Sequence, residues 1–480
     1  MRKLLRKVRR WMTKMAKEHE NLRGPLRYAM NFYRLVRYKL GTMFVKVDEK
    51  TVIFASFAGN AYSDNPKALF EYMIRDERFT DYTFVWGFKK GVAAHRRLLK
   101  NLVKGLYPDV QEIGDGGMDI VEDEKEKKPV YDQNDQNAAA QETEHVQGPK
   151  VVVVKYGGKT WRKYLARSKY WFFNFKVEDF LKPKKDQVFL QTWHGTPLKR
   201  LGYDLEHFDN VLNTEAGMKK RYGIEVQKFD YFISPSPFAT EKFRSAWRMD
   251  DFGKHDIILE EGYPRNDILS NYTQEYLDEI KVKRFGYYYL QYEKLIKKKT
   301  IVLYAPTYRS NQHETGVGYV YKEEIDFDRM QSELGDDFII LFRAHYFVAN
   351  RFNFSKYPGF VYNVSKVEDI NELYLISDIL ITDYSSTMFD YAILKRPMIF
   401  YMYDLEHYRD ESNGFYFDPE EELPGPIVKT EYELFEALKK AASGFVYDEK
   451  YRKFNEKFDP LDDGCVCERV VDKIFKKETV

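Results

Sequence analysis

The stretch DILITDYSSTMFDYAILKR, residues 378–396, places a strand, a polar turn and a helix in direct succession. The apolar run at 379–382 is typical of a buried strand, and the apolar residues of 388–393 recur at helical spacing. Between them lies the turn Asp383-Tyr384-Ser385-Ser386. A strand that leads through a short turn into a helix is the repeating unit of a doubly wound sheet, so this stretch predicts an α/β fold.

The two serines of this turn fall at the expected N-terminus of the helix. Free backbone N–H groups, the helix dipole and the hydroxyl groups of Ser385 and Ser386 would together form an anion site suited to phosphate. Serine is also a favoured N-cap at helices that bind no ligand. The pair by itself therefore does not separate a phosphate site from ordinary capping.

Short β-rich runs, separated by helix-compatible stretches, continue on both sides of this stretch. Each run is almost continuously apolar, as in strands that are covered on both faces of a parallel sheet. A charged helical connector at 272–298 divides the runs into two groups, which indicates two doubly wound α/β halves. We expect a basic segment at 1–45, an N-terminal Rossmann-like domain at 46–270 and a C-terminal Rossmann-like domain at 271–480. The runs are TVIFASF, YTFVWGF, VVVVKYG, YWFFN, QVFLQTW, FDYFISPS and IILEEGYPRND before the connector, and TIVLYAPTYR, DFIILFRAHY, FVYNVS, DILITDYSS and PMIFYMYD after it.

Polar side chains follow the expected strands in both halves. In doubly wound sheets the ligand crevice lies outside the carboxyl ends of the strands, so the repetition of such residues indicates one shared cleft. These residues are His194, Ser234, Ser236, Arg265, Thr307, Arg309, Arg343, His345, Asp383, Ser385 and Ser386.

His194 is the best candidate for a general base. It lies in QTWHGTPLKRLG, residues 191–202, where a strand-like run breaks into a Trp-His-Gly-Thr-Pro turn with two cations behind it. Gly195 leaves the backbone open on one side, so the imidazole can reach a ligand. A structural histidine is the other interpretation, and the turn alone does not exclude it.

Arg343 and His345 lie at positions i and i+2 after an apolar run, hence on the same side if the chain stays extended. A guanidinium and an imidazole together can hold a diphosphate without a metal and neutralise charge as the leaving group departs. Thr307 and Arg309 are placed similarly, and GYPRND adds Arg265. Each group could be an ordinary strand end, but their combination favours a phosphorylated or nucleotide-linked substrate.

Metal and cofactor chemistry is poorly supported. The sequence has no His-x-x-x-His pair, no Asp-x-Asp at an expected strand end and no Gly-x-x-x-x-Gly-Lys-Ser/Thr phosphate loop. GDGGMD at 114–119 has no strand before it, so a dinucleotide fingerprint lacks its context. We expect no metal and no cofactor.

The composition agrees with a globular cytoplasmic protein. With 480 residues, of which 44% are apolar and 17% aromatic, the chain is long enough for two folded units. Cys465 and Cys467 suit neither a disulfide nor a metal site, which favours a reducing compartment. No run of about 18 apolar residues could cross a bilayer, and no secretory signal is present.

The N-terminal segment is strongly basic. Residues 1–40 hold 13 Lys and Arg against two acidic residues, and the apolar residues between them recur at helical spacing. The pattern is typical of an amphipathic helix in the headgroup zone of an anionic membrane; a solvated helix packed on the protein and a nucleic-acid arm are the alternatives. We expect membrane binding and no nucleic acid. The acidic stretch 112–150 indicates a flexible surface insertion.

The motifs together resemble those of the CDP-glycerol glycerophosphotransferases, the teichoic acid polymerases and primases, with their CDP-ribitol relatives. The resemblance runs from about residue 50 to residue 470, broken by the acidic insertion. It rests on the order and spacing of FASFAGNAYSDNP, QTWHGTPLKRLG, SPSPFATEKF, GYPRND, LYAPTYR, RAH, DILITDYSSTMFDYAILKRPMIFYMYDLEHY and GFYFD.

This resemblance implies a GT-B architecture, in which two Rossmann-like domains face each other across a cleft, and peripheral attachment to the cytoplasmic face of the cell membrane. The domain at 46–270 would then bind the acceptor, and the domain at 271–480 would bind the CDP-activated donor. The reaction would transfer glycerol phosphate from CDP-glycerol to a hydroxyl group of a lipid-linked teichoic acid acceptor, with release of CMP. His194 would be catalytic near the acceptor, and His345 would be catalytic beside the pyrophosphate. The implied substrate-binding residues are Gly195, Thr196, Arg265, Thr307, Arg309, Arg343, Asp383, Ser385 and Ser386.

Several alternatives stay open. The two histidines could exchange roles, because a sequence gives no distances. The donor could be CDP-ribitol, the enzyme could be a GT-B glycosyltransferase or epimerase that uses a nucleotide sugar, or the chain could be a membrane-bound scaffold without activity. The choice between primase and polymerase, the acceptor lipid, and the choice between a monomer and a homo-oligomer are open as well.

Overall fold

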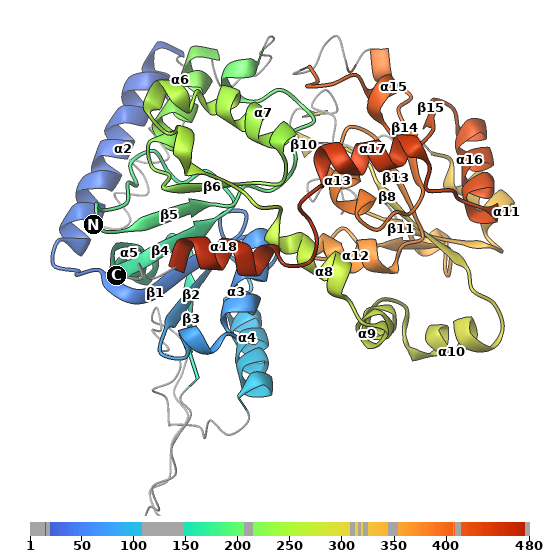
Figure 1. Cartoon of the computed structure of the whole chain (residues 1–480), viewed down its shortest axis with the longest axis horizontal. Helices are drawn as coiled ribbons and strands as arrows, with labels where there is room; N and C mark the ends of the chain where they lie inside the picture. The colour runs from blue at the N-terminus through green and yellow to red at the C-terminus, as the bar shows by residue number, and fades with distance from the viewer. Residues whose placement is uncertain are drawn as a thin grey trace, which may run out of the picture. The chain divides into compact units, whose positions relative to one another are not determined.

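The computed structural model describes residues 15, 20–107, 148–205, 215–307, 313–314, 318–319, 325–343, 354–406, 408 and 414–475 (Figure 1). The chain divides into two compact units. The first unit comprises Met1–Asn60, Ile74–Phe172 and Lys176–Phe189. The second unit comprises Ala61–Met73, Phe173–Phe175 and Leu190–Val480.

The first unit is built on parallel strands. β1 pairs with β2 in parallel, with Val52 opposite Phe84, and β2 pairs with β3 in parallel, with Val85 opposite Val152. Its strands follow the spatial order β3-β2-β1-β4, and the expected runs at 51–57, 82–88, 151–157 and 170–174 all contribute to them. The elements are α2 (Glu20–Thr42), β1 (Asp48–Ala55), β2 (Thr83–Phe88), α4 (Val92–Leu106), β3 (Lys150–Lys155), α5 (Lys159–Arg167) and β4 (Ser168–Phe173).

The second unit contains a doubly wound, six-stranded parallel sheet with the order β12-β11-β8-β13-β14-β15. The strand order reverses between β8 and β13, and in such sheets ligands bind outside the carboxyl ends of the strands at this point. In addition, β6 lies between β5 and β7 and is parallel to both. The strands are β5 (Val188–Gln191), β6 (Tyr231–Ser234), β7 (Ile258–Glu260), β8 (Thr300–Ala305), β9 (His313–Glu314), β10 (Gly318–Tyr319), β11 (Phe338–Phe342), β12 (Val361–Asn363), β13 (Ile379–Thr382), β14 (Met398–Tyr401) and β15 (Ile427–Val428).

Helices cover both faces of the six-stranded sheet. Leu303 of β8 packs in one cluster with Phe389, whereas its neighbour Val302 packs in another with Met330 and Leu434. Successive residues thus face opposite sides, and both sides are buried, which explains the continuously apolar runs. The helices of the second unit are α3 (Asp64–Met73), α6 (Glu215–Val226), α7 (Pro237–Trp247), α8 (Asp267–Asn271), α9 (Gln274–Phe285), α10 (Tyr287–Leu295), α11 (Phe327–Leu334), α12 (Ile370–Ile376), α13 (Thr387–Ala392), α15 (Pro419–Glu422), α16 (Glu431–Ser443), α17 (Glu449–Phe458) and α18 (Val466–Phe475).

The predicted α/β fold with parallel sheets is confirmed, and the charged connector is the helix pair α9 and α10. Residues 1–14 and 16–19 of the basic segment and residues 112–147 of the acidic insertion lie outside the described residues. The domain limits near 45 and 270 stay predictions. Within the described ranges, no helix combines the length and the apolarity that crossing a membrane requires.

Candidate active site

The His194 turn, residues 192–197, owes its shape to Trp193. This residue has a φ of 50°, a conformation that bulky residues rarely adopt, and its side chain is only 6% exposed. Its indole ring packs edge-on against Trp247 at a centroid distance of 4.8 Å and also contacts Phe232 and Phe243. Because the indole is held inside, the next residue turns outward, and His194 is exposed.

One nitrogen of His194 is already fixed by the backbone. Nδ1 lies 2.7 Å from the carbonyl oxygen of Asn174, which follows β4. A carbonyl oxygen only accepts, so Nδ1 carries the hydrogen, and in the neutral ring Nε2 keeps its lone pair. The imidazole also packs against the Trp193 ring, with centroids 4.2 Å apart. A neutral, oriented imidazole with an accepting Nε2 is the form that a general base requires.

At Gly195, the His194 turn lies against the turn at 383–386, which is named the serine turn. A Cβ atom at position 195 would lie 2.8 Å from Oγ and 3.2 Å from Cβ of Ser386, so the two backbone turns approach as closely as a glycine permits. Next in the chain, the buried Thr196 hydroxyl has no hydrogen-bond partner among the described residues. Two motifs that are far apart in the sequence thus meet at one place.

The serine turn lies at the reversal point of the sheet. Asp383 Oδ1 accepts from the backbone N–H groups of Thr307 at 2.8 Å and Tyr384 at 2.7 Å, which joins the ends of β8 and β13. Ser385 Oγ accepts from Thr387 N–H at 3.4 Å, whereas Ser386, although it stands at the N-cap position of α13, makes no capping bond through its hydroxyl. Ordinary capping therefore accounts for Ser385 but not for Ser386.

Arg343 lies at the carboxyl end of β11. Its backbone N–H donates to Tyr304 at 2.9 Å, and Nη1 donates to the carbonyl oxygen of Val367 at 2.7 Å and reaches that of Val364 at 3.4 Å. Burial lowers the pKa of the Arg343 guanidinium from its usual value, with the nearby Tyr374 and Asp369 acting in the opposite direction. Its predicted neighbours His345 and Arg309 lie outside the described residues.

Arg265 is held in a buried ion network instead of at a free strand end. Nη2 donates to both carboxylate oxygens of Asp390 at 2.8 and 3.0 Å, and Nη1 lies 3.3 Å from Asp64 Oδ1. The guanidinium also lies over the Tyr263 ring, 4.4 Å from its centroid. Burial lowers the pKa of Arg265, but the carboxylates of Asp390 and Asp64 outweigh it and raise the pKa well above its usual value. A direct contact of Arg265 with phosphate stays a prediction.

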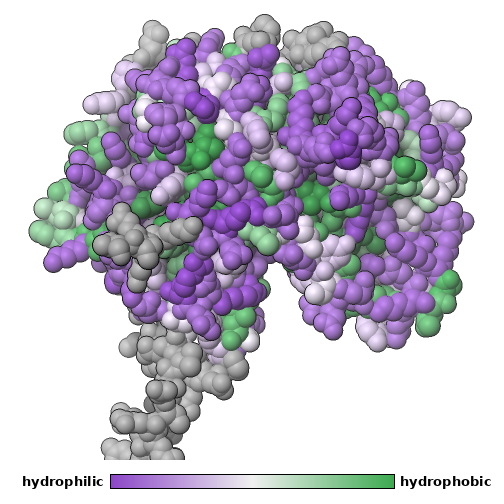
Figure 2. All heavy atoms as spheres, viewed as in Figure 1, coloured by the Kyte–Doolittle hydropathy of each residue, from purple (hydrophilic) through white to green (hydrophobic). Residues whose placement is uncertain are grey.

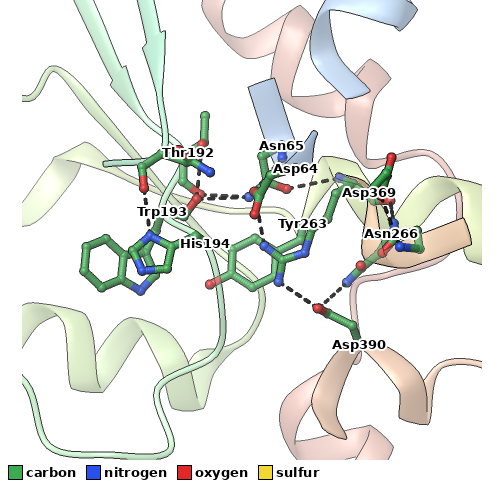
Figure 3. A network of polar contacts seen from close by, with 12 residues as sticks. Asp64, Asn65, Thr192, Trp193, His194, Tyr263, Asn266, Asp369 and Asp390 are labelled. Carbon is green, nitrogen blue, oxygen red and sulfur yellow. Dashed lines mark hydrogen bonds and ion pairs between the residues drawn. The ribbon is translucent and has the colours of Figure 1, made fainter. Parts of the chain in front are cut away.

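Asn65 and Asp390, which the sequence analysis did not single out, connect these parts. Asn65 contacts both the His194 turn and the backbone of Arg265, and Asp390 connects Arg265 to α13 (Figure 3). The only signal was SDNP at 63–66, which reads as an ordinary helix start. Asp390 was not recognised because it lies inside a short, mostly apolar helix.

Two further buried carboxyl groups lie beside this network. Asp462 Oδ1 accepts from Tyr263 N–H at 2.9 Å and from Asn266 Nδ2 at 3.4 Å. Burial raises the pKa of Asp462 to about 8, and burial together with Asp462 raises the pKa of Asp459 well above its ordinary value. No group of three or more His, Cys, Asp or Glu side chains able to hold a metal ion occurs in the part of the chain that the structure describes.

Comparisons with known proteins agree with the resemblance. A family model described as CDP-glycerol:poly(glycerophosphate) glycerophosphotransferase matches residues 37–107 and 118–476. A teichoic acid poly(glycerol phosphate) polymerase of Staphylococcus epidermidis is 36% identical over 90% of this chain, which spans 51% of that relative. A teichoic acid glycerol-phosphate transferase of Staphylococcus aureus is 35% identical over 92% of this chain and 98% of its own length. The chain thus spans about half of the first relative and nearly all of the second.

A solved structure of the wall teichoic acid polymerase TagF superimposes on this chain with a TM-score of 0.71. The two are 34% identical, and the match covers 95% of this chain and 97% of the solved one.

Proposed function

Because the chain belongs to the CDP-glycerol:poly(glycerophosphate) glycerophosphotransferase family, we propose that it transfers glycerol phosphate from CDP-glycerol to a hydroxyl group of a lipid-linked teichoic acid acceptor and releases CMP. The family description and both relatives name glycerol phosphate, which favours CDP-glycerol over CDP-ribitol. The observation that carries the proposal is the close approach of Gly195 to Ser386, since an exposed histidine then lies beside the turn at the reversal point of a parallel sheet.

In the proposed reaction, Nε2 of His194 takes the proton of the acceptor hydroxyl while its oxygen attacks the β-phosphorus of CDP-glycerol. The new P–O bond forms as the bond from the β-phosphorus to the bridging oxygen breaks, and CMP leaves with that electron pair. Arg343, His345 and the serine turn would stabilise the negative charge that develops on the phosphate oxygens and on CMP. The two histidines could exchange these roles.

The other residues of the proposed site would bind the donor or orient the residues that bind it. Thr196, Thr307 and Arg309 would complete the donor site, and Asp383 would orient the serine turn through the two N–H groups it accepts from. We also propose a GT-B arrangement of two Rossmann-like domains with a boundary near residue 270. The reaction as written needs neither a metal nor a cofactor.

Peripheral membrane attachment through α2 fits a lipid-linked acceptor. Along this helix, apolar side chains at intervals of four residues are exposed, with Tyr28 at 75%, Phe32 at 57%, Val36 at 37% and Leu40 at 67%, while Tyr38 is buried. Arg34, Arg37 and Lys39 lie among them. An apolar stripe with interspersed cations is suited to an anionic bilayer surface.

A second surface of this kind lies on α10, which the sequence analysis treated only as a charged connector. Tyr288 is 86% exposed and Leu295 is 82% exposed, beside the lysines of the run 297–299. Figure 2 shows hydrophobic side chains at the surface where Figure 1 places α10. The signal was present in the sequence as YYYLQYEKLIKKK, an aromatic and aliphatic stretch next to a lysine cluster.

The proposed function is tested by offering the protein a synthetic lipid-linked primer with CDP-[14C]glycerol, CDP-ribitol or a UDP-sugar. We expect label in the lipid fraction and release of CMP with CDP-glycerol. Label transferred only from CDP-ribitol would show that the donor is CDP-ribitol instead of CDP-glycerol. Label from a UDP-sugar alone would remove the proposal, and vesicle binding without any transfer would identify a scaffold.

A further inference from the structure

Asn65 is fully buried in the first turn of α3, and both ends of its side-chain amide are used. Nδ2 donates to the carbonyl oxygen of Thr192 at 3.0 Å and reaches that of Trp193 at 3.4 Å. Oδ1 accepts from the backbone N–H of Arg265 at 3.1 Å. The side chain therefore joins the backbone of the His194 turn to the backbone of the loop that carries Arg265 (Figure 3).

The two carbonyl groups that Asn65 reaches flank the unusual backbone of Trp193. One belongs to the peptide before Trp193 and the other to the peptide before His194. A bulky residue keeps a φ of 50° only where its surroundings hold it there. A change of φ at this residue would swing the following peptide, and with it the direction in which the His194 ring extends.

The helix that carries Asn65 is itself anchored. Lys67 Nζ lies 2.5 Å from Asp369 Oδ2, and the backbone N–H of Tyr62 donates to Glu368 Oε2 at 2.7 Å. Through Arg265 and Asp390 the same framework reaches α13, the helix that the serine turn precedes. Asn65 thus belongs to a fixed framework that contacts both sides of the candidate site.

We infer that Asn65 is a positioning residue, which holds the peptides around Trp193 so that Nε2 of His194 points toward the reacting hydroxyl group. The inference rests on the proposed function, because His194 is the general base only there. It assigns no contact between Asn65 and substrate. Replacement of Asn65 should therefore change kcat and the position of the hydrogen on the His194 ring, but not the affinity for the donor.

Two variants separate this role from simple stability. Asn65→Asp has the same shape and keeps the acceptor for Arg265 N–H, but loses the donor to Thr192 and Trp193. Asn65→Leu removes both polar groups at similar size. Gln187→Met is the matched control, since Gln187 is also buried and its Nε2 also donates to backbone carbonyl oxygens, those of Leu165 at 2.7 Å and Ser168 at 2.6 Å. Gln187 comes just before β5, whereas His194 follows β5.

We expect kcat for transfer from CDP-glycerol to fall about 100-fold in both Asn65 variants, with KM for CDP-glycerol within about threefold of wild type, because small misplacements of a reacting group cost on this order. The control should keep its kcat even where its melting temperature falls as far. Turnover of both Asn65 variants within threefold of wild type would overturn the inference.

A readout that needs no turnover accompanies the kinetics. In protein labelled with 15N-histidine, the imidazole nitrogen shifts of His194, assigned with His194→Gln, should report hydrogen on Nδ1 in wild type and in Gln187→Met. The Asn65 variants should move toward hydrogen on Nε2 as the bond to Asn174 loosens. An unchanged ring state would overturn the inference even if kcat falls, whereas a changed ring state in a protein without CDP-glycerol activity would count against the proposed function alone.

Discussion

Trp193 and His194 divide the work of one turn between packing and chemistry. The indole ring is buried among Phe232, Phe243 and Trp247, and this packing stabilises a backbone conformation that an isolated tryptophan avoids. The neighbouring imidazole is exposed, and its Nδ1 is held by a carbonyl oxygen. The aromatic residue thus determines where the polar one can act.

Replacement of the exposed imidazole tests its chemical role. His194→Gln should lower kcat about 10² to 10⁴-fold, as the loss of a general base commonly does, with little effect on folding. His255→Gln is the matched control, because His255 is also exposed, at 55%, and pairs with Asp256 at the surface. Steady-state kinetics with CDP-glycerol decide the question, and wild-type turnover in His194→Gln would contradict the assignment.

The buried carboxyl group of Asp462 should make the free energy of unfolding depend on pH. Burial raises its pKa from 3.8 to about 8, so the folded protein holds this proton more tightly than the unfolded chain does. The resulting stability is fully present below about pH 4 and is lost as the pH rises through 8. Asp462→Asn keeps the acceptor for Tyr263 N–H, and its free energy of unfolding should fall less between pH 5 and pH 8 than that of wild type.

Urea unfolding at several pH values measures this difference. The exposed Asp251, whose side chain is 61% accessible, supplies the control Asp251→Asn, which should keep the wild-type slope. Equal slopes for wild type and Asp462→Asn would show that the buried carboxyl group does not carry this pH dependence.

At the scale of elements, two short helical segments are joined by a buried ion pair. α13 has only six residues, and the 3₁₀ turn η5 (Pro264–Asn266) has three. The pair formed by Arg265 and Asp390 joins these two elements in a buried environment, with side-chain exposures of 5% and 7%. The serine turn before α13 is thereby held by a contact that lies one turn farther along the helix.

Breaking this pair should be costly. Asp390→Asn leaves the Arg265 charge buried beside the more distant carboxylate of Asp64, and removal of one partner of a buried pair typically costs about 3–5 kcal/mol. Asp250→Asn is the control, because the pair of Arg244 and Asp250 is 45% and 60% exposed and such pairs contribute about 0–1 kcal/mol. Chemical denaturation gives both values, and similar losses for the two variants would contradict the prediction.

At the scale of the whole molecule, the proposed contact with a membrane would use two exposed apolar helices. α2 and α10 belong to different units, and each shows an apolar surface beside basic residues.

Flotation with vesicles that contain phosphatidylglycerol tests both helices. The double variants Phe32→Glu with Leu40→Glu, and Tyr288→Glu with Leu295→Glu, should each lower the bound fraction by tenfold or more, because each large apolar side chain withdrawn from lipid costs about 1.5–3 kcal/mol. Tyr432→Glu with Val446→Glu is the control, since these side chains are 65% and 78% exposed on another part of the surface. Undiminished binding of either test variant would exclude that helix.

The strands were predictable because both faces of a parallel sheet are buried, so each strand is a continuous apolar run that local sequence displays. The meeting of the His194 turn with Ser386 was only partly predictable, since the strand-end rule places residues at one edge of a sheet but gives no distances. Arg265 was expected at a strand end, but its pairing with Asp390, which lies 125 residues further along the chain, was not foreseen. A charged residue inside an apolar helix gives no local sign of its partner.

By itself, the sequence determined the parallel α/β fold and the family, because apolar periodicity and the order of motifs can be read directly along the chain. The tertiary structure alone decided that Trp193 is strained and buried, that Nδ1 of His194 is fixed by Asn174, and that Asn65 connects the histidine turn to Arg265. Such features arise from hydrogen bonds between residues far apart in the chain, and their energies depend on burial, which only a folded structure defines.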